Sequence, residues 1–178
     1  PCFDWFQVKL STLPHEAAKR VAIIGAGGFL GSHLHDFLSE ERYAVLGLDT
    51  EHHIPERAHV VCRKHFVEIP VHIFKAFSAV IYLHGLSPRS DEVPQADKVL
   101  ERNVLDPIRV ARRMSGTQLL LLLSEPSSME KPDSILGFNV HAWEQRLQSM
   151  SGGPRVVALR LGTVVGVSPR QRIDGLHV

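Results

Sequence analysis

A glycine-rich turn between an apolar run and an amphipathic segment constrains this chain more than any other feature. The apolar residues 21–24 lead into Gly25, Gly28 and Gly31, and a later apolar run ends at Asp49. Glycines at this spacing suit a tight turn, a close approach of backbone N–H groups to a pyrophosphate at a helix N-terminus, and close packing of helix on strand. A carboxylate after the second strand is placed to accept hydrogen bonds from the two hydroxyl groups of a ribose. The order of strand, glycines, helix, strand and acid therefore predicts a Rossmann-type unit with a dinucleotide site.

Short apolar runs alternate with amphipathic segments along the rest of the chain. Because these runs are β-branched or leucine-rich and mostly lack a polar alternate, we expect strands over residues 21–25, 43–49, 58–62, 79–84, 118–123 and 155–161. Apolar residues recur every three or four positions in the expected helices, residues 28–40, 70–77, 94–114 and 134–150. Pro107 should bend or interrupt the third of these helices. The alternation predicts an α/β fold with a doubly wound parallel sheet of order 3-2-1-4-5-6.

Composition bounds the size of the fold and the classes of partner. The 178 residues are 44% hydrophobic and 22% charged, which predicts one Rossmann-like NAD-binding domain over residues 21–178. A net charge of +1 gives no bulk attraction to nucleic acid or to anionic membranes. Cys2, Cys62 and the 11 histidines lack metal-ligand spacing, so we expect no metal site. No apolar run approaches the roughly 20 residues of a membrane span.

Residues 1–20 form an apolar-rich extension ahead of the first expected strand. The extension has no signal-peptide architecture and includes Phe3, Trp5 and Phe6. Exposed together, these side chains would form an apolar patch of the kind that isolated soluble proteins avoid. We expect the extension to dock on a partner protein; the alternative is that it folds back over the helices of its own domain.

Four segments resemble the extended short-chain dehydrogenase/reductases, the NAD-dependent epimerase/dehydratase family. The first segment is the glycine loop of residues 25–31, and the second is residues 79–85, followed by Asn103-Val104 at the position of the family's Asn-Val pair. The third segment, residues 136–144, aligns with the family motif Tyr-Gly-x-Ser-Lys-x-x-x-Glu. The fourth, residues 160–170, aligns with the family's Arg-x-x-x-Val-Tyr-Gly-Pro strand and loop. The resemblance implies descent from a nucleotide-sugar epimerase or dehydratase. It implies NAD in preference to NADP, because Asp49 would repel a 2′-phosphate.

The catalytic positions of the family depart from its pattern in this chain. Family chemistry needs a Tyr acid/base and a Lys four residues on, whereas this sequence has Leu136 and Val140 there. Neither side chain exchanges a proton, so we assign no catalytic residue. Ser124 is the candidate for the serine that completes the family's catalytic triad with Tyr and Lys. Without those two residues, no neighbouring group activates its hydroxyl. The alternative is that Ser124 only ends a strand. The chain ends soon after Pro169, so we also expect the substrate lobe to be largely absent.

The cofactor positions also depart from the family. Residues 63–66 offer no carboxylate where the family carries an Asp that contacts adenine. His84 stands where the family has a small residue beside the nucleotide; it crowds the pocket, contacts phosphate, or turns outward with a hydrogen bond. Asp49 has the alternative role of capping the following turn. Dinucleotide binding is thus either retained or lost. If retained, the predicted contacts are Gly25, Gly28, Phe29, Leu30, Gly31, Asp49 and His84.

The resemblance has noncatalytic precedents, since an accessory subunit of respiratory complex I belongs to this family and mitochondrial ribosomes recruit enzyme-like scaffold proteins. We therefore expect a noncatalytic subunit of a larger assembly, mitochondrial rather than cytoplasmic, with protein partners. A stripe of basic side chains on one helix is expected to be a solvated helix face, and contact with RNA phosphates is the alternative: Arg102, Arg109, Arg112 and Arg113. The competing hypothesis is an active NAD-dependent oxidoreductase or epimerase whose acid/base residues are supplied elsewhere.

Overall fold

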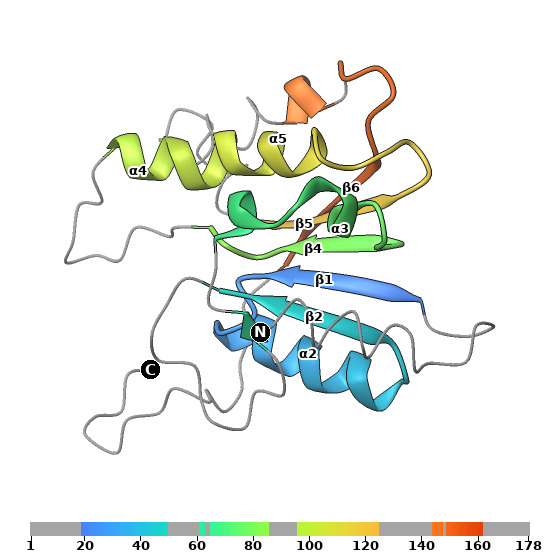
Figure 1. Ribbon diagram of the computed structural model, residues 1–178. Coiled ribbons are helices and arrows are strands. Elements are labelled where there is room, and N and C mark those ends of the chain that lie inside the picture. The colour runs from blue at the N-terminus through green and yellow to red at the C-terminus, as the bar shows by residue number, and fades with distance from the viewer. Residues whose placement is uncertain are drawn as a thin grey trace, which may run out of the picture.

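A parallel β-sheet forms the centre of the protein (Figure 1). The computed structural model describes residues 19–49, 61–62, 65–85, 96–124, 144–147 and 149–161. The strands are β1 (Arg20–Ile24), β2 (Ala44–Leu48), β3 (Val61–Cys62), β4 (Ala79–Tyr82), β5 (Leu119–Ser124) and β6 (Arg155–Arg160). They lie in the order β3-β2-β1-β4-β5-β6, and every neighbouring pair is parallel. The predicted fold class and strand order are confirmed.

Helices cover both faces of this sheet (Figure 1). On one face, α2 (Phe29–Glu40) packs its Leu34 and Leu38 against Val21, Ile23 and Val45. On the other face lie the 3-10 helix η1 (Phe66–Glu68), α3 (Val71–Phe74), α4 (Ala96–Leu100), η2 (Glu101–Leu105) and α5 (Asp106–Ala111). Since successive side chains of a strand point to opposite faces, burial on both sides explains why the central strands are apolar throughout.

The long helix after β4 changes its winding just before Pro107. Residues of α4 are α-helical, those of η2 are π-helical, and α5 resumes the α-helix with Pro107 in its first turn. A proline lacks the N–H of the helical hydrogen bond, and its ring clashes with the carbonyl group four residues earlier. A π-turn widens the helix at that point, so the predicted interruption is confirmed.

Two other expected elements are shorter or lie partly beyond the described residues. The helix expected over residues 70–77 is only one turn long: Pro70 precedes its first residue, and residues 75–76 form a turn. Of the strand expected over 58–62 the structure describes residues 61–62, and of the helix expected over 134–150 it describes a helical turn at 144–147. The extension over residues 1–20 lies almost wholly outside the described residues. Among the helices that are described, none is long and apolar enough to cross a membrane.

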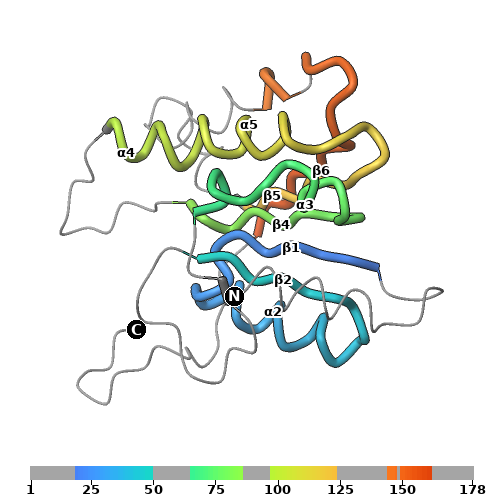
Figure 2. The backbone as a smooth tube through the Cα atoms, viewed as in Figure 1, coloured from blue at the N-terminus to red at the C-terminus, as the bar shows by residue number. Residues whose placement is uncertain are grey.

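The carboxyl ends of β1, β2 and β4 meet at one edge of the sheet, where the chain enters α2 (Figure 2). The connection after β1 runs to β2 on one side, and β4 pairs with β1 on the other. Such a reversal of strand order leaves a crevice outside the carboxyl ends of the strands, where open α/β sheets bind their ligands.

Candidate functional site

The glycine loop after β1 has the geometry expected of a tight turn. Gly25 has a φ of 90°, and its backbone N–H donates to the carbonyl oxygen of Leu48 at 2.8 Å. A Cβ atom on Gly31 would lie 2.1 Å from the carbonyl oxygen of Gly25, so any larger residue would force α2 away from the loop. Gly28 precedes the first residue of α2 and provides no side-chain cap, which leaves the start of the helix to backbone groups. Gly25 and Gly31 therefore have the turn and packing roles predicted for them.

Asp49 follows β2 and ties it to the glycine loop. Its side chain is buried, with 6% of the residue exposed, and its Oδ2 accepts a hydrogen bond of 2.8 Å from the backbone N–H of Gly27. The carboxylate thus lies beside the loop, at the place expected for a ribose-binding acid. The turn after Asp49 is not among the described residues, so the alternative capping role is not tested.

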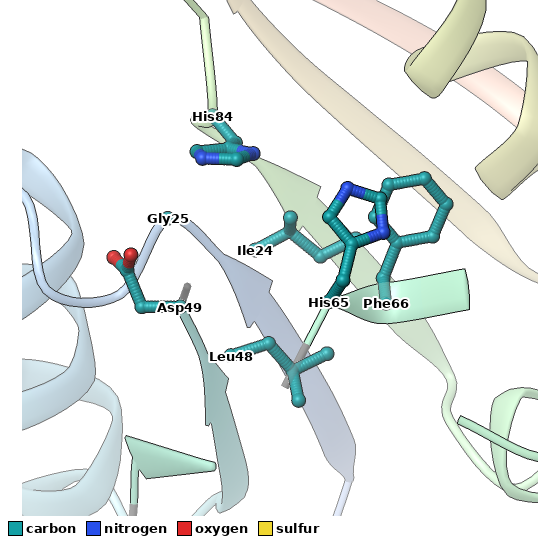
Figure 3. Close-up of a pocket in the computed structure, with 7 residues that line it drawn as sticks. All are labelled: Ile24, Gly25, Leu48, Asp49, His65, Phe66 and His84. Carbon is teal, nitrogen blue, oxygen red and sulfur yellow. The ribbon is translucent and has the colours of Figure 1, made fainter. Parts of the chain in front are cut away.

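His84 faces the same crevice from the end of β4 (Figure 3). Two hydrogen bonds hold the backbone around His84. The N–H of Leu83 donates to the carbonyl oxygen of Ile24 at 2.8 Å, and the Tyr82 hydroxyl lies 3.2 Å from the carbonyl oxygen of His84. Its Nε2 is buried and has no hydrogen-bond partner within the described structure. The alternative of an outward, hydrogen-bonded histidine does not match this arrangement, because the ring lines the pocket and its Nε2 is buried without a partner.

A small pocket lies between these groups. Its lining residues are Ile24, Gly25, Leu48, Asp49, His65, Phe66 and His84. In Figure 3 the carboxylate of Asp49 lies on one side, His65 and Phe66 lie on the other, and His84 lies across from them beyond Gly25. The space measures about 180 Å³, open solvent included.

His65 and Phe66 are pocket residues that the sequence analysis did not assign. The only signal for them was their place after the third expected strand. Phe66 is fully buried beneath the pocket. The N–H of His65 donates to Glu68 Oε1 at 2.9 Å, and its Nδ1 accepts from the N–H of Val67 at 3.4 Å, so a capping box holds the histidine at the start of η1.

A buried acid stands behind His65. Asp106, which is 1% exposed, lies with Oδ2 3.6 Å from His65 Nε2 and with Oδ1 2.8 Å from Arg109 Nη1. Because His65 Nδ1 accepts a backbone hydrogen bond, its Nε2 carries the proton in the neutral ring and faces this carboxylate. The ring centroids of His65 and His84 lie 6.4 Å apart. The two histidines therefore belong to one set of interacting groups.

Burial lowers the pKa of His84, and the neighbouring charge of Arg102 lowers it further. Asp49 acts in the opposite direction, followed by a smaller lowering effect of His65 and a smaller raising effect of Asp106. The ring is therefore held toward its neutral form. Tyr82 beside it has a pKa well above the ordinary value because its hydroxyl is buried, and that hydroxyl donates to the carbonyl oxygen of Arg102 at 2.6 Å.

The four arginines of the basic stripe, for which RNA contact is the alternative to a solvated face, differ in their surroundings. Arg109 pairs with Glu101 at 3.0 Å and with Asp106 at 2.8 Å. Arg113 donates to the carbonyl oxygens of Ile69 and Val67, and its guanidinium group lies over the ring of Phe74. Arg112 is exposed and Arg102 is partly buried. Arg109 and Arg113 thus have structural roles inside the domain, and an RNA contact stays a prediction.

The remaining sequence assignments fall outside what the structure describes. Leu136 and Val140 lie in the range 125–143, and the side chain of Ser124 at the end of β5 is not described either. Within the described ranges there is no group of three or more His, Cys, Asp or Glu side chains that could hold a metal ion.

A sequence profile described as the NAD dependent epimerase/dehydratase family matches residues 21–133. The chain belongs to this family. The match includes the glycine loop, Asp49, His65 and His84, so the whole pocket lies within the shared region. No curated protein matches the chain.

Solved structures of epimerases and dehydratases share the fold. MoeE5 in complex with UDP-glucuronic acid and NAD is 25% identical, with a TM-score of 0.68, over 88% of this chain and 58% of its own. TunA, an NAD-dependent NDP-hexosamine 5,6-dehydratase involved in tunicamycin biosynthesis, is 20% identical, with a TM-score of 0.72, over 89% and 58%. WbmG of Bordetella bronchiseptica in complex with NAD is 22% identical, with a TM-score of 0.68, over 91% and 58%. The chain thus spans less than two thirds of the length of these enzymes.

Proposed function

We propose that this chain binds NAD at the pocket beside Asp49 and does not carry out the oxidation, epimerisation or dehydration chemistry of its family. The main support for NAD binding is the buried carboxylate of Asp49, which accepts a hydrogen bond of 2.8 Å from the glycine loop. A carboxylate at this edge of the sheet can also accept hydrogen bonds from the hydroxyl groups of a ribose.

The residues present fit the adenosine and pyrophosphate part of NAD. Gly31 leaves no room for a Cβ atom, so α2 starts close against the loop and directs its first N–H groups outward. Asp49 would hold the ribose, the backbone of Gly28, Phe29 and Leu30 would face the pyrophosphate, and His84 has a buried nitrogen that awaits a partner. The relatives MoeE5 and WbmG were solved with NAD, which supports the same cofactor here.

The same carboxylate supports NAD over its 2′-phosphorylated form. A phosphate on the adenosine ribose would lie against Asp49, and two negative charges in a partly buried site repel strongly. Isothermal titration with NAD and NADP tests this directly. We expect NAD to bind at least tenfold more tightly than NADP; equal affinity for both would contradict the assignment.

The noncatalytic half of the proposal rests on Leu136 and Val140. When bound, NAD supplies hydride transfer, but a partner group must move the proton at the substrate hydroxyl. Alkyl side chains hold no proton at those positions. The alternative is an active enzyme whose acid/base group comes from another chain, and a turnover assay on the purified protein and on its native complex separates the two.

We further propose that the protein is a subunit of a larger mitochondrial assembly. Two observations support protein partners: the apolar residues Phe3, Trp5 and Phe6 of the sequence, and the exposed Val157 and Leu159 on β6, the last strand in the described sheet. Native purification from isolated mitochondria, followed by mass spectrometry of the co-purifying chains, tests this. Recovery of the protein as a free monomer would contradict it.

A further inference from the structure

His84 and Asp49 lie across the pocket from each other, with Gly25 between them (Figure 3). The glycine loop lies close against the backbone of His84 because Gly25 has no side chain: a Cβ atom there would lie 3.0 Å from the backbone nitrogen of His84. Two side chains that can accept hydrogen bonds, Asp49 and His84, therefore border one space, which the apolar side chains of Ile24 and Leu48 also line.

This space lies apart from the place where phosphate groups would bind. Gly28, at the start of α2, does not line the pocket, whereas Asp49 and His84 do. Backbone N–H groups at a helix N-terminus bind pyrophosphate. The hydrogen-bonding groups that line the pocket between His84 and Asp49 are therefore side chains, which suit hydroxyl groups of a ribose more than its phosphates.

The Nε2 atom of His84 is buried and lacks a hydrogen-bond partner in the described part of the chain. A buried polar atom without a partner is unfavourable, so its presence points to a partner that binds there. A hydroxyl group pairs with a neutral imidazole nitrogen in either tautomer, because a hydroxyl both donates and accepts.

We propose that His84 is a specificity-determining residue that binds one hydroxyl of the nucleotide ribose while Asp49 binds the other, so that the pocket selects an intact cis-diol. The inference rests on the proposed binding of NAD and assigns one hydroxyl contact of the ribose to His84. His84 acts in its neutral form, as an uncharged partner for an uncharged hydroxyl.

The charged groups around His84 give this contact a definite pH dependence. Those that face it are Asp49 after β2, His65 before η1, Arg102 on η2 and Asp106 on α5. Burial and Arg102 oppose a positive charge on the ring more than Asp49 favours it, and the pKa of His84 is lowered from its ordinary value of 6.5. Binding is therefore complete above that pKa and weakens as the pH falls through it. A contact with phosphate would have the opposite sign, because the protonated ring would bind the anion better.

The experiment is titration calorimetry of the full chain with adenosine 5′-monophosphate and with its 2′-deoxy and 3′-deoxy analogues. We expect the wild type to bind both analogues more weakly than the parent nucleotide. His84→Ala should weaken binding of the parent about five- to tenfold and lose the discrimination against one analogue, while it keeps the discrimination against the other. The exposed His72→Ala on α3 is the matched control and should change nothing. Thermal unfolding of each variant verifies that it is folded.

The outcomes separate this inference from the proposed function. If the wild type binds the nucleotide and His84→Ala binds it equally well, with the same discrimination, the inference is wrong and the proposed function stands. Tighter binding by His84→Ala would also overturn it, because the ring would then be an obstruction. Tighter binding by the wild type at about pH 5.5 than at about pH 8 would assign the ring to phosphate instead. If the wild type binds neither NAD nor the monophosphate, the proposed function fails and this inference fails with it.

Discussion

The carboxylate of Asp49 and the backbone N–H of Gly27 are 2.8 Å apart, although 22 residues separate them in the sequence. This hydrogen bond joins the end of β2 to the turn after β1. It fixes both halves of the crevice at the carboxyl edge of the sheet, so Asp49 has a structural role besides the ribose-binding role proposed for it.

Replacing Asp49 separates these two roles. Asp49→Ala leaves the N–H of Gly27 without its acceptor, so the free energy of unfolding should fall by about 1–3 kcal/mol. Asp49→Asn keeps an oxygen acceptor but removes the charge, so its stability should stay near that of the wild type while its preference for NAD over NADP narrows. Denaturant unfolding and calorimetry measure the two effects. An Asn variant that rejects NADP as strongly as the wild type would contradict the charge argument.

Gly31 should tolerate substitution far less than other glycines. A Cβ atom there would lie 2.1 Å from the carbonyl oxygen of Gly25 and 2.7 Å from Cα of Ala26. Gly31→Ala should therefore lower the free energy of unfolding by about 1–3 kcal/mol or more, because backbone atoms must move. Gly116→Ala is the control, since its nearest contact would be 3.5 Å and its φ is not in the left-handed region. Equal stability of the two variants would show that α2 shifts freely.

Adjacent arginines on the helix after η2 should behave differently. Arg113 donates to two carbonyl oxygens of the segment before α3, at 2.6 and 2.9 Å. Arg113→Ala should cost about 1–3 kcal/mol of stability, whereas Arg112→Ala, at an exposed position, should change stability by less than about 0.5 kcal/mol. If the helix also contacts RNA, Arg112→Ala should weaken RNA binding without a loss of stability. No change in RNA affinity would favour the solvated face.

The purified chain should show no turnover with nucleotide sugars and either nicotinamide cofactor. The reason is chemical: Leu136 and Val140 replace the side chains that move the proton. Absorbance of the reduced cofactor and chromatography of the sugar products are the measurements. Turnover that persists through purification and disappears in Ser124→Ala would contradict the noncatalytic assignment.

The sequence was sufficient for the architecture because the strands are buried on both faces and therefore read as short apolar runs. Pro107 predicted the interruption of the helix because a proline lacks the N–H of the helical hydrogen bond, which is a property of the residue itself. Asp49 and the glycines were identifiable because their spacing along the chain reflects one βαβ unit.

Other features depend on contacts between distant segments and were not predictable. The orientation of His84 follows from the pairing of β4 with β1 and from the buried hydroxyl of Tyr82. The role of Arg113 depends on carbonyl groups 44 and 46 residues earlier in the chain. His65 reaches the pocket because its capping box and the nearby Asp106 hold it there. No local pattern encodes these three relationships.

Titration of NAD into the full wild-type chain and its Asp49→Ala variant tests the central claim most directly. The account predicts saturable binding at one site by the wild type, with a rise in the melting temperature that grows with NAD concentration, and loss of both in the variant. Absence of binding by the wild type at millimolar NAD, or equal binding by the variant, would contradict the assignment of this pocket.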